Sequence, residues 1–224
     1  MTDRLLGAAT LVGMTSAMLA ALVFAPTEVT MGVIQRIFYF HVPAGITSYI
    51  AFLVVGVGSI LFLITRNSKW DHLAYCSAEV GVLFASANIV MGMIWAKPIW
   101  GIWWTWDMRL TLQLLLALIF VSYLMLGAYV SDPNKRANLQ AVFGILGSVD
   151  VPVNYMAIRW WRTQHPAPVI GGGSDSGLDP AIALALAVSM SAFLIFYVFL
   201  LRKRLALEKI TQQVDYFEQS VLSR

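Results

Sequence analysis

Cysteine and charge are both scarce in this chain of 224 residues. The single cysteine, Cys76, excludes an intramolecular disulfide, and the lack of a Cys-x-x-Cys-His motif excludes covalent attachment of haem through thioethers. Charged residues make up 12% of the sequence, whereas an ordinary soluble domain contains about 25%. Together with a hydrophobic fraction of 59%, this shortage of charge predicts an integral membrane protein without a separate soluble domain.

Long apolar runs supply the expected membrane segments. A helix needs about 20 apolar residues to cross the hydrocarbon layer, and six runs are long enough. The first run is longer than the apolar part of a typical signal peptide, so we interpret it as a retained span. The expected fold is all-α, a polytopic bundle of six transmembrane helices over residues 1–201 with a tail at 202–224. The predicted spans are 5–25, 43–64, 74–95, 112–130, 139–158 and 181–201.

Basic residues are unevenly distributed between the two sides of these spans. Ten of the fifteen lie on the side of the two termini, and the positive-inside bias therefore places both termini in the cytoplasm. The connections on the extracytoplasmic side hold the other five, which are Arg36, Lys97, Arg109, Arg159 and Arg162.

Five of the eight tryptophans gather in the segment 95–111, which is expected to connect the third and fourth spans on the outer side. Tryptophans collect at the interfaces of many membrane proteins, so an aromatic belt is the simple alternative. The density of this segment, and its charged residues Lys97, Asp107 and Arg109, favour an aromatic surface for a large flat ligand.

Each outer connection next to this segment contributes one histidine, His41 before it and His165 after it. Neutral imidazole is a common axial ligand of haem iron, so the pair could hold haem between the two rings. The alternative is that each histidine merely begins a helix. His72, expected in an inner loop, cannot reach the same site and is an internal control.

Charged residues near the outer face suggest how a carboxylate-bearing ligand would be held. Guanidinium groups bind carboxylates in pairs of hydrogen bonds, which makes Arg109 the first candidate for haem propionates, with an ion pair to Asp107 as its alternative role. Asp150 shares a helical face with Asn154 and is a candidate to orient a ligand or a histidine. Glu79, near the cytoplasmic end of the third span, is expected to serve packing or a partner subunit.

The tail carries an apolar stripe with alternating spacings of three and four residues, Leu207, Ile210, Val214, Phe217 and Val221. This pattern is typical of a helical seam. We therefore expect the tail to contact another subunit or the membrane surface, and to have no catalytic role.

The residues from Trp100 to Thr111 resemble the tryptophan-rich WWD signature of haem-handling proteins of c-type cytochrome biogenesis. With six spans and a flanking histidine on each side, nearly the whole chain is similar to the CcmC family. This resemblance implies that His41 and His165 are the axial ligands of haem iron. It also implies that the tryptophan loop cradles a non-covalently bound haem b, with contacts among Trp100, Trp103, Trp104, Trp106, Asp107 and Arg109.

The resemblance further implies a location and partners. The protein would lie in a bacterial inner membrane with its haem site facing the periplasm, as a subunit of an ABC-type complex with the ATPase CcmA, the membrane protein CcmB and the small protein CcmD. It would deliver haem to the haem chaperone CcmE and would not be an enzyme.

Two other functions are consistent with a small apolar bundle. A membrane haem oxidoreductase would usually place histidines inside its spans, whereas no histidine is expected in the middle of a span here. A transporter of an amphipathic solute would place its site near the midplane on broken helices, and the fifth span alone is interrupted, at Pro152.

Overall fold

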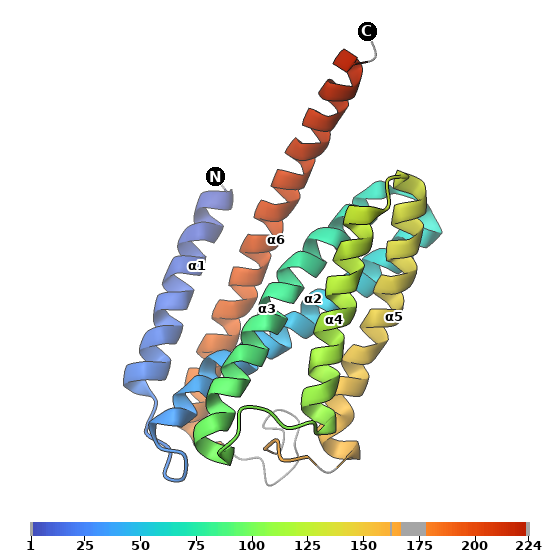
Figure 1. The fold of residues 1–224 in the computed structure, drawn as a ribbon. Coiled ribbons are helices and arrows are strands. Elements are labelled where there is room, and N and C mark those ends of the chain that lie inside the picture. The colour runs from blue at the N-terminus through green and yellow to red at the C-terminus, as the bar shows by residue number, and fades with distance from the viewer. Residues whose placement is uncertain (1, 162, 167–177, 223–224) are drawn as a thin grey trace.

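A computed structural model describes residues 2–161, 163–166 and 178–222, and these residues form six long helices (Figure 1). The elements, in chain order, are α1 (Thr2–Leu19), the π-helical turn η1 (Ala20–Phe24), the 3-10 turn η2 (Val33–Ile37), α2 (Phe38–Thr65), α3 (Ser68–Trp100), α4 (Met108–Tyr129), α5 (Pro133–Trp160) and α6 (Pro180–Leu222). All six helices are long and apolar enough to cross a membrane. The prediction of an all-α polytopic membrane protein with six spans is confirmed.

Short polar turns join the helices at one end of the bundle. Arg66 adopts a left-handed conformation with φ of 56° and ends α2, and the side chain of Asn67 then accepts a hydrogen bond from Lys69 N at 3.1 Å to begin α3. Asp132 begins α5 in the same way through Lys135 N at 2.7 Å, with Pro133 in the first turn. These caps satisfy exposed backbone amides and make α2–α3 and α4–α5 tight hairpins.

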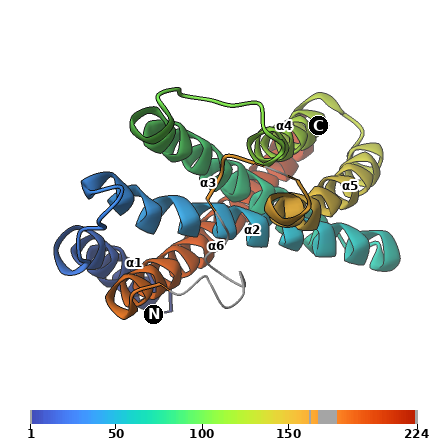
Figure 2. The same cartoon turned by 90° about the horizontal axis from the view of Figure 1, so that it is seen from below.

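The helices α2 and α3 form the centre of the molecule (Figures 1 and 2). The pair α1 and α6 lies on one flank, and the pair α4 and α5 lies on the other, as the view along the bundle in Figure 2 shows. The two termini lie at the same end, and the connections η1–α2 and α3–α4 lie at the opposite end. This opposite end is therefore where the predicted outer segments come together.

Close helix packing at the centre depends on small residues beside stacked aromatic rings. Phe52 of α2 and Phe120 of α4 stack with centroids 3.9 Å apart and an interplanar angle of 5°. Gly81 of α3 leaves room for this pair, because a Cβ there would lie 2.6 Å from Phe52 Cε1. Helices in lipid associate through such close contacts, since lipid chains are as apolar as the helix surfaces.

Two of the predicted boundaries that differ from the observed helices lie near the predicted site. α2 begins at Phe38, so His41 lies in its first turns and not in the preceding loop. α3 continues through Pro98 to Trp100, and the non-helical part of the 95–111 segment is only residues 101–107. Hydropathy marks the apolar stretch of a helix, but backbone hydrogen bonds can continue beyond it, and a proline near a helix end removes only one of them.

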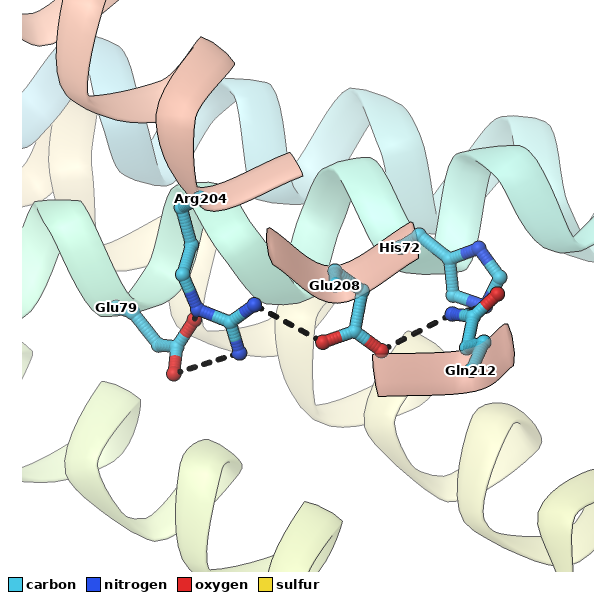
Figure 3. A network of polar contacts seen from close by, with 5 residues as sticks. All are labelled: His72, Glu79, Arg204, Glu208 and Gln212. Carbon is cyan, nitrogen blue, oxygen red and sulfur yellow. Dashed lines mark hydrogen bonds and ion pairs between the residues drawn. The ribbon is translucent and has the colours of Figure 1, made fainter. Parts of the chain in front are cut away.

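α6 is much longer than a membrane span and passes residue 202, the predicted start of the tail, without a break. Its 43 residues give a length of about 65 Å, at about 1.5 Å per residue. Arg204 of α6 forms an ion pair with Glu79 of α3 at 2.6 Å and bonds Glu208 at 3.0 Å (Figure 3). Gln212 Nε2 lies 2.9 Å from His72 Nε2. The polar side of this segment is thus bound to α3 of the same chain. Glu79 accordingly serves packing between α3 and α6.

The apolar stripe of α6 lies outside these contacts. Its five residues, Leu207, Ile210, Val214, Phe217 and Val221, are between 49% and 70% exposed. The structure contains no partner chain, so contact of this stripe with a subunit or with the membrane stays a prediction.

Candidate functional site

His41 and His165 lie next to one another at the end of the bundle where the outer segments meet. The centroids of their rings are 6.4 Å apart, with an interplanar angle of 32°. His41 comes from the start of α2, and His165 comes from the described segment 163–166 after α5. Two histidines that are far apart in the sequence are therefore neighbours in space, as the sequence predicted.

The surroundings of His41 set its orientation. Its Nδ1 lies 3.0 Å from the backbone oxygen of Asn88 in α3 and 3.2 Å from the amide nitrogen Nδ2 of the same residue. The amide nitrogen Nδ2 of Asn88 donates to the backbone oxygen of His41 at 2.9 Å. Gly92 provides space for the ring, since a Cβ there would lie 3.0 Å from His41 Cε1.

His165 is also held through its Nδ1. Its Nδ1 donates to the backbone oxygen of Pro166 at 3.0 Å, and its own backbone N–H donates to Thr163 Oγ1 at 3.1 Å. Burial, and then the positive charge of Arg109, lower the pKa of His165 below its usual value. A neutral imidazole with a free Nε2 is the form that binds metals, and a hydrogen bond at the other ring nitrogen is what fixes it.

The spacing of the two rings suits one metal atom between them. A metal lies about 2 Å from each imidazole nitrogen that binds it, so the two bonds span about 4 Å and the two half rings take up the rest of the 6.4 Å between centroids. No cluster of three or more His, Cys, Asp or Glu that could hold a metal occurs in residues 2–161, 163–166 and 178–222. Two protein ligands fit a metal that brings its remaining ligands with it, as the iron of haem does.

Two cavities adjoin the histidine pair. The smaller one, of about 60 Å³, extends toward α3 and α4 and is lined by Trp100, Trp104 and Gln113. The larger one, of about 350 Å³, extends toward η2, α5 and α6 and is lined mainly by apolar side chains. Both cavities share the same five residues, which are His41, Gly92, Trp95, Arg109 and His165. The histidine pair and Arg109 therefore stand where the two cavities meet.

Arg109 is fixed by a buried polar network. Its Nη1 donates to the backbone oxygen and to Oδ1 of Asn154 in α5, both at 2.6 Å, and its guanidinium lies 5.7 Å from the ring centre of Tyr49. Gln113 Oε1 accepts from Tyr49 Oη at 3.0 Å and from Asn154 Nδ2 at 3.1 Å. The network joins α2, α4 and α5 and places a cation beside the histidines.

Asp107 has a different role from the ion pair considered as an alternative for Arg109. Its Oδ1 accepts from Leu110 N at 3.1 Å and begins α4, and its Oδ2 accepts from Thr105 Oγ1 at 2.9 Å. An ion pair between Asp107 and Arg109 is absent from the described part of the chain. Asp107 therefore shapes the loop at 101–107, and its contact with haem stays a prediction.

The five tryptophans of the segment 95–111 divide into two groups. Trp95, Trp100 and Trp104 line the smaller cavity, and Trp95 meets Trp100 edge to face at 5.2 Å. Trp103 and Trp106 line neither cavity and are 52% and 76% exposed. Trp104, whose ring meets Trp106 at 5.8 Å, is the member that links the groups. A haem contact for any of the five stays a prediction.

The other predicted polar residues lie outside the histidine pair. Arg36 donates to the backbone oxygens of Ala21 (2.9 Å) and Leu22, at the end of η1, and Lys97 donates to Gly101 O at 2.9 Å. Arg159 is placed 4.9 Å from the ring centre of Tyr155. Arg162 lies outside the described residues. Asp150 has one buried carboxylate oxygen for which the described residues provide no hydrogen-bond partner.

The sequence interpretation missed two residues that position the site, Asn88 and Gln113. Each is a single uncharged polar residue inside an apolar run. Polar side chains in such runs usually face the interior of a membrane bundle, and this signal could have identified both. Their partners could not have been identified, because they belong to other helices.

Comparison with known proteins finds relatives that match most of the chain. The family model described as heme exporter protein C matches residues 2–219 of the chain. A heme exporter protein C from Bradyrhizobium diazoefficiens is 30% identical over 201 residues, which cover 89% of this chain and 76% of that protein. The protein of the same name from Haemophilus influenzae is 32% identical over 197 residues, covering 85% and 78%. The Escherichia coli K12 protein is 30% identical over 172 residues, covering 77% and 69%.

Proposed function

We propose that this protein handles haem during the maturation of c-type cytochromes. The basis is that the chain belongs to the CcmC family, also described as heme exporter protein C. Haem b would bind non-covalently between His41 and His165 and later leave the protein. The observation that carries this proposal is the neighbouring pair of imidazoles, 6.4 Å apart.

Three features support haem over a bare metal ion. The pair supplies two imidazole rings whose centroids are 6.4 Å apart, a spacing that suits the two axial ligands of haem iron. The larger cavity beside the pair has a mainly apolar lining suited to a porphyrin ring. Arg109, fixed by Asn154, places a positive charge where a propionate would be stabilised.

The protein would act as a carrier and not as an enzyme. A bond between an imidazole nitrogen and haem iron can be broken without cleaving any bond within haem or the protein chain, which suits a ligand that must be passed on. We propose that haem is delivered to the haem chaperone CcmE at the periplasmic face of an inner membrane, and that the protein works in an ABC-type complex with CcmA, CcmB and CcmD. The support for this wider scheme is membership of the family and the position of the histidines at the end opposite the termini.

The proposal is tested by the visible spectrum of the protein purified from haem-replete cells. Wild type should show a Soret band typical of six-coordinate haem, and the double variant His41→Ala, His165→Ala should lose it. His72→Ala is the matched control, because His72 contacts Gln212 at the other end of the bundle. An unchanged Soret absorbance per mole of protein in the double variant would contradict haem binding at this pair.

A further inference from the structure

Two residues that line the smaller cavity carry hydrogen-bond donors without a partner among the described residues. Gln113 is 7% exposed, and its Nε2 has no hydrogen-bond partner among the described residues. The same holds for Nε1 of Trp104, which also lines the cavity. Buried polar groups are normally paired, so two unpaired donors beside one cavity indicate a hydrogen-bond acceptor that does not belong to the described residues.

The orientation of the Gln113 amide follows from the network around it. Arg109 can only donate, so the atom of Asn154 that faces it is the oxygen Oδ1 and the other side-chain atom is the nitrogen Nδ2. Because Nδ2 can only donate, the atom of Gln113 that meets it is Oε1. The Nε2 group, with two N–H bonds, is therefore the free end of this side chain.

The character of these groups defines the ligand. Gln113 Nε2 and Trp104 Nε1 can only donate, and Arg109 beside them adds a positive charge. The nearest acid in the loop, Asp107, is already bound to Leu110 and Thr105. A site of donors and positive charge takes an anionic acceptor, and a carboxylate has two oxygens to share among them.

The size of the cavity supports a small group. Its volume of about 60 Å³ corresponds to about two water molecules at roughly 30 Å³ each, which is the scale of a carboxylate and far below that of a porphyrin. The larger cavity next to it has about 350 Å³. The ring of a ligand and its carboxylate thus have separate spaces, joined at the histidines.

We propose that Gln113 and Trp104, together with Arg109, form a buried subsite for one carboxylate of the ligand whose ring lies at the histidine pair. This inference rests on the proposed function, because it takes that ligand to be haem and the carboxylate to be a propionate. Gln113 then contributes to specificity, since it distinguishes a free acid from an uncharged analogue.

The test compares haem with its dimethyl ester, which keeps the iron and the ring but lacks free carboxylates. Affinities are measured by Soret titration of the full chain in detergent. Wild type should bind haem at least about tenfold more tightly than the ester, the effect of one hydrogen bond to a charged group. Gln113→Glu keeps the acceptor for Tyr49 and Asn154 but replaces the free donor with an oxygen. It should reduce the preference for haem over the ester about tenfold.

Two further variants make the result specific. Trp104→Phe removes one donor and keeps an aromatic ring, so it should reduce the preference in the same direction, and it decides the question if Gln113→Glu does not fold. Gln140→Glu is the matched control, because Gln140 is another buried glutamine but donates to Tyr123 O, outside both cavities. It should leave the preference unchanged.

Each remaining outcome overturns a distinct statement. Equal binding of haem and ester by wild type, or an equal loss of both in Gln113→Glu and Trp104→Phe, would overturn the carboxylate subsite while haem binding stands. Competition between free acetate and haem would assign the subsite to a separate small carboxylate. Absence of haem binding in wild type would overturn the proposed function itself.

Discussion

Asn88 shows how a single residue can hold a ligand-binding histidine without touching the ligand. It contacts His41 three times, through its backbone oxygen at Nδ1 and through its amide nitrogen at both Nδ1 and the backbone oxygen of His41. The proline at position 43 sits next to this contact and cannot donate a backbone N–H. The position of the imidazole thus depends on the neighbouring helix α3 and not only on α2.

Replacing Asn88 by alanine should weaken haem binding without abolishing it. The backbone bond to His41 Nδ1 remains, but the amide that fixes the start of α2 is lost, and loss of such supporting contacts lowers metal affinity by about 10- to 100-fold. Soret titration of Asn88→Ala measures the change. Asn138→Ala, which removes side-chain bonds with Asn134 O and Arg66 Nη1 on the exposed surface, is the control. A haem affinity equal to that of wild type would show that the side chain of Asn88 does not position His41.

At the scale of elements, α6 does two separate things. Its first part crosses the bundle beside α1, and its extension beyond residue 202 binds the start of α3 through Arg204 and Gln212 (Figure 3). Figure 1 shows the extension continuing in line with the rest of α6, past the ends of the neighbouring helices. The extension therefore projects from the bundle, and the apolar stripe lies on this projecting part of α6.

Breaking the ion pair between Arg204 and Glu79 should loosen this extension. Both side chains are less than one-third exposed, and we expect Glu79→Gln to raise local opening of residues 205–214 roughly fivefold, near the upper limit for a partly exposed pair. Hydrogen exchange of this segment is the measurement. Asp3→Asn removes the more exposed pairs with Arg202 and Lys203 and should have a smaller effect. Equal protection in Glu79→Gln and wild type would mean that apolar packing alone holds the extension.

At the scale of the whole molecule, six spans place both chain ends on one side and the histidine pair on the other. The surplus of basic residues on the side of the termini predicts that this side is cytoplasmic. The site would then open toward the compartment in which c-type cytochromes receive their haem.

This orientation can be tested with single cysteines in cells. Val29, in the connection between η1 and η2, is 99% exposed, and Gln213 is exposed on the extension of α6. A membrane-impermeant maleimide should label Val29→Cys in spheroplasts and Gln213→Cys only after lysis. The native Cys76 is buried and should remain unlabelled in both cases. The reverse labelling pattern would place the histidine pair in the cytoplasm.

The sequence by itself determined the class of the protein and the main parts of the site. Low charge and six apolar runs are sufficient for the number of spans, since the thickness of the bilayer sets the length of each helix. The tryptophan-rich segment and the matching positions of His41 and His165 were visible because topology alone brings outer connections to one side. These signals are local in sequence, or depend only on counting spans.

Only the tertiary structure decided how these parts fit together. The orientations of the two imidazole rings depend on contacts with Asn88 and with the carbonyl oxygen of Pro166, and the role of Arg109 depends on Asn154 from another helix. The split of the tryptophans into a lining group and an exposed group likewise follows from the turn at residues 101–107 and the length of α3. Hydropathy does not contain this information, because all these side chains are positioned by contacts between helices that are distant in the sequence.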